Sequence, residues 1–294
     1  MKAICTPESK RGTVMARLQH LIFVVALAHC TPPLQRAYLI ALGNATLLQR
    51  SLEHNLRLPR DSIHVWTAVN ATRATPDSVT LYAQHTIAHG RHDHMQLGSL
   101  PALGCLLSHM QVWQHMLTQP EDEVAIFEED AWPREDAHML VQGVRADAWR
   151  WASNWTLLKL TTEAGHRVVE SGRWQYHTPR LASCATKGGC VTFGTRGYLL
   201  RRRGAQVLLR QVGALDVQVD ALLSLVDAYD PEFRMLWSTQ SMCVEPVWLQ
   251  HSTTVWDGCL KCFITPLTPY YLILGVCIVA LLVLHRRHKK MYLA

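Results

Sequence analysis

The sequence of 294 residues has no internal repeat and no long low-complexity segment, which excludes a repeat array and predicts one compact domain. It also lacks an excess of positive charge away from its ends. Four basic residues precede residue 18 and four follow residue 284; without these eight and Glu8, the formal net charge of +6 becomes −1. Nucleic-acid binding therefore has no electrostatic support.

The N-terminal apolar run is short. Residues 18–28 follow Lys10, Arg11 and Arg17 and end in the small-residue pattern Ala-Leu-Ala. A bilayer needs about 20 helical residues, so this run does not span one. A basic start, a short apolar run and small residues are typical of a secretory signal peptide, which we predict over residues 1–28. A buried N-terminal helix is the weaker alternative.

The C-terminal apolar run is long enough to span a membrane. Residues 263–284 contain no charge and would rise about 33 Å as a helix. The basic tail 285–294 then lies in the cytosol by the positive-inside bias. The sequence thus predicts a single-pass type I protein of the secretory pathway membrane, in the endoplasmic reticulum, the Golgi or the cell surface. Residues 29–262 are its luminal domain, large enough for one α/β core.

Three acceptor sequons lie in this luminal part. They begin at Asn44, Asn70 and Asn154, and each reads Asn-X-Thr. Such sequons are glycosylation acceptors in secreted domains, so we predict a glycoprotein.

Seven of the nine cysteines also fall there: Cys30, Cys105, Cys184, Cys190, Cys243, Cys259 and Cys262. In an oxidising lumen some should pair, and Cys184 with Cys190 or Cys259 with Cys262 would close short loops. The odd count leaves one thiol free or intermolecular. A zinc site from those four cysteines is disfavoured by their spacing.

Strand-like and helix-like segments alternate along the luminal part. Residues 37–42 read as a strand, 45–56 as a helix and 62–69 as a second strand, which predicts a parallel sheet. A helix over 103–117, a strand over 124–127, a helix over 134–144 and a strand over 155–160 follow. Residues 190–210 suggest a strand, a glycine-permitted turn and a helix from Arg201; another helix begins near Ala221. The fold class is α/β.

An acidic triplet follows the strand over 124–127. Glu128, Glu129 and Asp130 stand where a buried strand leaves the sheet, which is where α/β proteins bind ligands. Three adjacent carboxylates repel one another unless a cation neutralises them, and oxygen ligands suit Mg²⁺ or Mn²⁺. Such a cation could bridge a diphosphate and stabilise its departure. A solvated turn is the plainer alternative.

Other polar residues have two readings each. Ser108 and His109 lie on the helix before the acidic strand, as candidate cofactor-binding residues or as buried structure. Asp220 begins a helix, where it either caps the helix or takes part in chemistry. Histidines also gather between residues 70 and 97, without helical spacing, and a surface loop is favoured there over a metal site. These are His85, His89, His92 and His94.

Several motifs occur in a fixed order. They are YLIALGNATLLQRSLE at 38–53, AVN at 68–70, GCLLSH at 104–109 with Trp113, FEED at 127–130, WTLLKL at 155–160, Gly197-Tyr198 to Gly204-Ala205, DALL at 220–223, and Pro246 with Gln250. In this order they resemble glycosyltransferase family 25, which includes bacterial lipooligosaccharide galactosyltransferases and procollagen galactosyltransferases. The resemblance covers residues 37–252.

The resemblance implies an A-type glycosyltransferase fold, with a Rossmann-like, mostly parallel sheet, and an inverting transfer of galactose or glucose from a UDP-sugar to a glycan or glycoprotein acceptor. Glu128 and Asp130, with Glu129 between them, would hold Mn²⁺ or Mg²⁺ against the diphosphate. Asp220 would be the base that takes the acceptor's proton. Arg50 and Lys159 would approach the diphosphate.

Two departures leave an alternative open. Glu129 replaces the family's middle aspartate, and Ala102 replaces a glutamate ahead of the Gly-Cys pair. A catalytically silent relative that acts as a binding glycoprotein is therefore the second hypothesis. The C-terminal anchor also differs from the N-terminal anchors usual for luminal transferases. A plain adhesion receptor would be a β-sandwich, which the strand and helix alternation disfavours.

Overall fold

The computed structural model describes residues 33–73, 96–161, 174–185, 194–212 and 217–244, with 83, 85, 87 and 88. The predicted signal peptide, the predicted span over 263–284 and the basic tail lie outside these residues. Within them, no helix combines the length and the apolar character needed to cross a membrane.

A mixed sheet of eight strands forms the centre of the described fold, in the order β2-β1-β3-β8-β5-β9-β7-β6. The strands are β1 (Ala37–Ala41), β2 (Ile63–Thr67), β3 (Glu123–Glu128), β5 (Leu157–Lys159), β6 (Trp174–Thr178), β7 (Leu181–Cys184), β8 (Gly197–Arg201) and β9 (Met235–Ser238). Strand β1 pairs in parallel with β2 and β3, and β5 with β9. Only β7 and β8 run against the other described strands. A separate two-stranded sheet pairs β4 (Trp132–Pro133) with β10 (Cys243–Val244).

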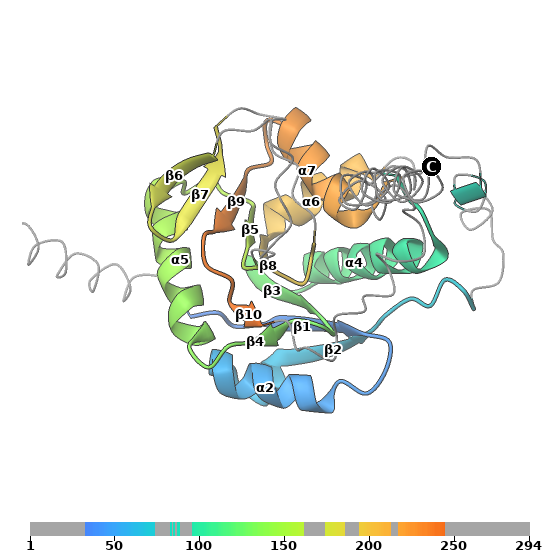
Figure 1. Cartoon of the computed structure of the whole chain (residues 1–294), viewed down its shortest axis with the longest axis horizontal. Coiled ribbons are helices and arrows are strands. Elements are labelled where there is room, and N and C mark those ends of the chain that lie inside the picture. Colours follow the sequence, from blue (N-terminus) through green and yellow to red (C-terminus); the bar gives the residue numbers. More distant parts are fainter. Residues whose placement is uncertain are drawn as a thin grey trace, which may run out of the picture.

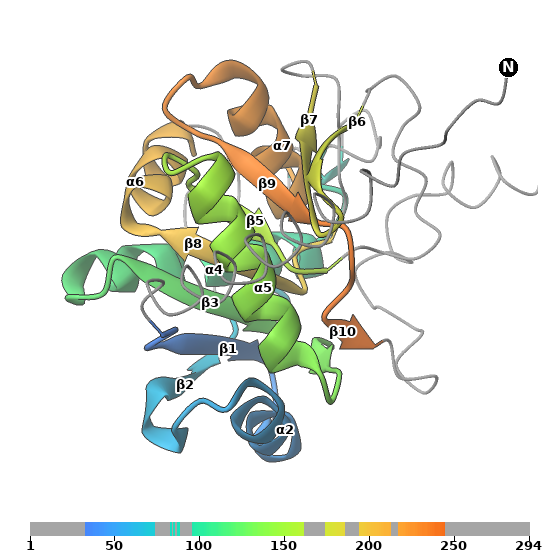
Figure 2. The ribbon, with the colours of Figure 1, turned by 90° about the vertical axis from the view of Figure 1, so that its left-hand side faces the viewer.

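Helices cover both faces of the large sheet (Figures 1 and 2). Helices α2 (Thr46–Leu56) and α5 (Ala137–Trp151) pack on one face. Helices α4 (Leu100–Thr118), α6 (Arg202–Gln211) and α7 (Val219–Tyr229) pack on the other. A short 3-10 helix, Arg60–Ser62, leads into β2. Covering both faces explains why the central strands are apolar throughout.

Side chains alternate strictly between these two cores. On β3, Ala125 and Phe127 join the α2 and α5 core, whereas Val124 and Ile126 join the α4, α6 and α7 core. Since successive strand residues point to opposite faces, the next even-numbered residue, Glu128, is directed toward α4.

The carboxyl ends of β1 and β3 meet where the chain reverses its progress across the sheet, since β1 has β2 on one side and β3 on the other. Ligands of open α/β sheets bind at such a point. Because β8 is antiparallel to β3, the start of β8 lies at the same edge. The Glu128 amide donates to the Arg196 carbonyl at 2.9 Å.

The predicted α/β class, with a mostly parallel sheet, is confirmed, and so is the parallel pairing of the first two strands. Most boundaries differ by a few residues at most, and two differences are larger. Helix α5 begins at Ala137 and continues to Trp151, beyond the predicted 134–144. Residues 197–201 form β8 and continue directly into α6, whereas the sequence predicts a glycine-permitted turn there. Tyr198 and Leu199 pack on opposite faces, which is the two-residue period of a strand.

Candidate active site

Three consecutive residues before β8 contact three carboxylates, which come from the end of β3, the turn after it and the start of α7. The Gly194 amide donates to Asp220 Oδ2 at 3.1 Å, the Thr195 hydroxyl donates to Glu128 Oε1, and Arg196 Nε pairs with Asp130 Oδ2 at 3.0 Å. This segment therefore gathers the end of β3 and the start of α7 at one edge of the sheet. Gly194 has φ 84°, a conformation that favours glycine.

A buried chain of hydrogen bonds leads to Glu128 from behind. The Trp113 indole donates to Tyr198 Oη at 2.9 Å, and Tyr198 Oη lies 2.7 Å from His109 Nδ1. His109 Nε2 lies 3.2 Å from Glu128 Oε1. Because an indole N–H only donates, the tyrosine hydroxyl is free to donate to Nδ1 of a neutral imidazole. Nε2–H then donates to Glu128 and fixes its orientation.

Glu128 is held in its charged form. Burial raises the pKa of this carboxyl, but the hydrogen bond and electrostatic attraction of His109, the hydrogen bond from Thr195 and the charge of Arg196 outweigh burial and bring the pKa below its usual value. Glu128 is therefore an anion at neutral pH.

Asp220 has the opposite shift. Burial raises the pKa of its carboxyl, and the negative charge of Glu128 adds to the rise. The Gly194 amide, the Lys159 ammonium and the Ala221 amide oppose it without cancelling it. A carboxylate with a raised pKa takes up a proton more readily, which suits a general base. Asp220 also accepts the Ala221 amide at 2.8 Å, so it serves the first turn of α7 as well.

The acidic triplet does not converge on one point. Glu129 is exposed, and its Oε2 accepts the Leu42 amide at 2.9 Å, which ties the end of β3 to the end of β1. Among the described residues, the set of three or more His, Cys, Asp or Glu whose ligand atoms lie within 4.8 Å of one another is Cys105, His109 and Glu128. The three carboxylates of the triplet are therefore not gathered into one cluster, and the Mn²⁺ or Mg²⁺ site stays a prediction.

The Ser108 side chain forms hydrogen bonds with backbone groups. Its hydroxyl donates to the Gly104 carbonyl at 2.6 Å and accepts the Val69 amide at 2.8 Å. A Cβ on Gly104 would lie 2.3 Å from the Val69 carbonyl oxygen. Gly104 and Ser108 thus fix the segment after β2 against α4.

Lys159 and Arg50, the two basic residues predicted to approach the diphosphate, lie in different parts of the fold. Lys159 is buried at the end of β5, close enough to Asp220 to act on its pKa. Arg50 is exposed on α2, on the face of the sheet away from α4, and makes no hydrogen bond or ion pair with the described carboxylates.

All three sequon asparagines are exposed. Asn44 follows β1 and Asn70 follows β2, and each accepts from the hydroxyl of the threonine two residues later at 2.6 Å. Asn154 follows α5 and accepts from Arg234 at 3.0 Å. Exposure is compatible with glycosylation, which stays a prediction.

Of the three described cysteines, one is in a disulfide and two are free thiols. Cys184 is in a disulfide whose other half lies outside the described residues, so its pairing with Cys190 stays a prediction. Cys105 and Cys243 are free thiols. Cys259 and Cys262, a candidate disulfide pair, lie outside the described residues. Most of the His-rich segment between residues 70 and 97 also lies outside them.

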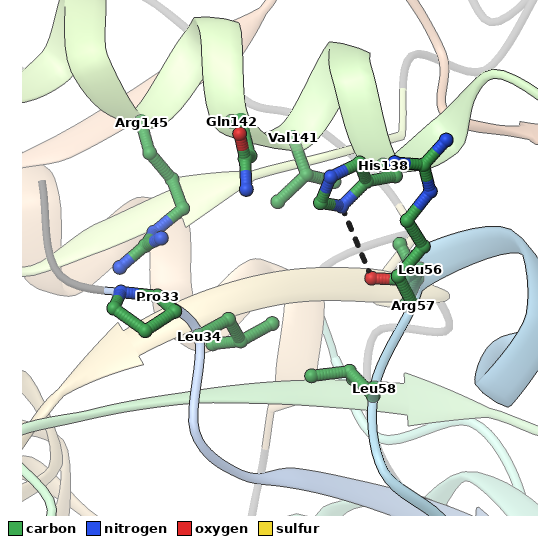
Figure 3. Close-up of a pocket in the computed structure, with 9 residues that line it drawn as sticks. All are labelled: Pro33, Leu34, Leu56, Arg57, Leu58, His138, Val141, Gln142 and Arg145. Carbon is green, nitrogen blue, oxygen red and sulfur yellow. Dashed lines mark hydrogen bonds between the residues drawn. The ribbon is translucent and has the colours of Figure 1, made fainter. Parts of the chain in front are cut away.

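A small cavity lies at the other end of the sheet (Figure 3). Helix α5 lines one side, and the segments before β1 and after α2 line the other; His138 Nδ1 lies 3.2 Å from the Leu56 carbonyl across it. Its volume of about 50 Å³ holds a few waters at most, far below a nucleotide-sugar site.

The class of protein follows from a parallel βαβ start and a carboxylate site at the strands' carboxyl edge, which together define a ligand-binding α/β domain. The chain matches the family model described as "Glycosyltransferase family 25 (LPS biosynthesis protein)" over residues 35–223. The chain belongs to glycosyltransferase family 25, as the order of its motifs predicts. Membership supports glycosyltransferase activity and implies a nucleotide-sugar donor and a glycan acceptor. A comparison with curated proteins finds no match.

Sequence reasoning missed the side chains that hold Glu128 and Asp130, either directly or through His109. These are Trp113, Thr195, Arg196 and Tyr198, and the Cys105 thiol beside them was missed as well. A usable signal was present for two of them. Thr195 and Arg196 are polar residues directly before an apolar strand, but only the antiparallel direction of β8 places them at the carboxyl edge.

Proposed function

We propose that this chain transfers galactose or glucose from a UDP-sugar to a glycan or protein-linked acceptor, with inversion, within an A-type glycosyltransferase fold. The observation that carries the proposal is the gathering of Glu128, Asp130 and Asp220 around residues 194–196. Family membership supplies the class of reaction. Its setting is a secretory pathway membrane, with the domain in the lumen.

Asp220 is the base in this proposal. Its carboxylate takes the proton of the acceptor hydroxyl while that oxygen attacks the anomeric carbon. The bond from the anomeric carbon to the diphosphate oxygen breaks, and UDP leaves with the electron pair. The raised pKa of Asp220 favours proton uptake. The nearby Lys159 charge favours the ionised form that must exist before the attack.

The other carboxylates position rather than react. Glu128 is oriented by His109 and Thr195, and Asp130 by Arg196. Mn²⁺ or Mg²⁺ stays a prediction from the resemblance, in which Glu128 and Asp130 would hold the ion and the ion would neutralise the charge of the diphosphate.

A donor screen tests the proposal. The full chain is offered UDP-galactose and UDP-glucose with simple glycan acceptors, with and without Mn²⁺. We expect transfer or donor hydrolysis that Asp130→Ala reduces strongly. Asp122→Ala is the matched control, since Asp122 is an exposed aspartate at the opposite end of β3 that also pairs with an arginine, Arg201. Equal loss in both variants, or no nucleotide binding with any donor, would reject the proposal.

The alternative is a silent relative that binds without turnover. The engagement of Glu129 with the Leu42 amide favours it, because that carboxylate is directed away from the converging set. It predicts UDP binding or glycan binding with no donor consumption in the same screen.

A further inference from the structure

We propose that Cys105, His109 and Glu128 form a zinc site at the carboxyl edge of the sheet, on the side of α4. Each offers one ligand atom, and the three atoms lie within 4.8 Å of one another. Zinc accepts thiolate, imidazole and carboxylate, and three protein ligands leave its fourth position open. This site shares Glu128 with the proposed transferase site, but zinc binding there requires no sugar donor.

The backbone sets this arrangement. Cys105 and His109 are four residues apart on α4, so their side chains lie on one face of the helix. Glu128 is the last residue of β3 and continues the alternation that directs Val124 and Ile126 toward α4. Zinc bonds of about 2.0–2.3 Å place the ligands of a tetrahedral ion about 3–4 Å apart. Small side-chain movements therefore close the set.

Neighbouring side chains that would not themselves bind the ion already hydrogen-bond two of the three ligands. His109 Nδ1 lies 2.7 Å from Tyr198 Oη, and Thr195 donates to Glu128. A metal-binding histidine usually engages its second nitrogen in this way. When Nε2 binds the ion, the ring proton belongs on Nδ1. Tyr198 Oη has two lone pairs and can accept that proton alongside the Trp113 indole.

The local charge favours a cation. Three carboxylates, Glu128, Asp220 and Asp130, act on the Cys105 thiol. Burial raises the pKa of this thiol well above its usual value, and the carboxylates raise it further. Sulfur and nitrogen ligands also select Zn²⁺ over Mg²⁺ or Mn²⁺.

Cobalt titration tests the site without any sugar donor. The full chain is stripped of metal with a chelator and titrated with Co²⁺, which stands in for zinc and absorbs in the near ultraviolet when bound by a thiolate. We expect this absorbance in the wild type and its loss in Cys105→Ser. Cys243→Ser is the control, since Cys243 is the other free, half-buried thiol of the described part and lies outside the set.

Tyr198→Phe gives a second readout. It removes no ligand, so the absorbance should persist while Co²⁺ affinity falls about 10- to 100-fold, the usual effect of losing an outer partner. Circular dichroism checks that each variant is folded. If Cys105→Ser is not folded, His109→Gln takes its place as the ligand variant. Absorbance that survives in the folded ligand variant, or no absorbance in the wild type, overturns the site. Because no donor is present, either result is independent of whether the chain transfers sugar.

Discussion

Asp220 is the residue on which transfer depends in this account. We predict that Asp220→Asn lowers kcat by about 10²- to 10⁴-fold, the usual contribution of general base catalysis. The base is active only when it is ionised. Because the pKa of Asp220 is raised above its usual value, the wild-type rate should fall as the pH drops through this raised pKa and Asp220 becomes protonated. Steady-state kinetics over a pH series measures both effects. UDP binding that stays near wild type in Asp220→Asn is the control for folding.

Glu129 should matter much less. Its side chain is exposed and accepts one backbone amide, so Glu129→Gln, which keeps an acceptor oxygen, should change the free energy of unfolding by less than about 0.5 kcal/mol. Donor consumption should stay close to wild type. Urea unfolding and the donor assay measure the two quantities. A loss of activity as large as that of Asp130→Ala would mean that Glu129 leaves Leu42 to bind substrate or metal.

At this scale, the sequence predicts the carboxylates but not their partners. Glu128 and Asp220 are recognisable because each ends or begins an element whose periodicity is visible. The pairing of Arg196 with Asp130 depends on an antiparallel contact between distant segments, which periodicity does not contain. Glu129 is directed away from Glu128 and Asp130 because it accepts the Leu42 amide at the end of β1, and the sequence pattern does not contain this contact either.

Among the elements, α4 depends on a close approach to the segment after β2. Gly104→Ala would place its Cβ 2.3 Å from the Val69 carbonyl oxygen, so helix or segment must move. We predict a loss of about 1–3 kcal/mol in the free energy of unfolding, as for overpacked sites. Gly43→Ala is the matched control, because nothing lies within 4 Å of its added Cβ. Chemical denaturation compares them, and equal stability of the two variants would contradict the contact.

Helices with one apolar face and strands with continuous apolar residues are predictable, which is why most boundaries agree within a few residues. Helix α4 extends to Leu100 because Ser99 caps it by accepting the Ala102 amide at 3.3 Å and Pro101 occupies its first turn. The sequence does not predict a strand at 197–201, because five residues beside glycines carry little periodic signal. Its direction is set by pairing with β3 and β5.

For the whole molecule, the site joins segments as far apart as Cys105 and Asp220, so ligand binding should stabilise the domain as a unit. UDP at about 100 times its Kd would add about 2.7 kcal/mol to the free energy of unfolding. We predict a rise of several degrees in Tm with UDP, measured by differential scanning calorimetry. Uridine, which lacks the diphosphate, is the control ligand. An unchanged Tm at saturating UDP would contradict a nucleotide site.

The most direct test is the rate of UDP-hexose consumption by the full chain at saturating donor, compared between wild type and Asp220→Asn. The account predicts measurable consumption by the wild type and a fall of at least about 100-fold in the variant, with UDP binding retained. Equal rates in the two proteins, or no consumption of any UDP-sugar by a wild type that binds UDP, would contradict it.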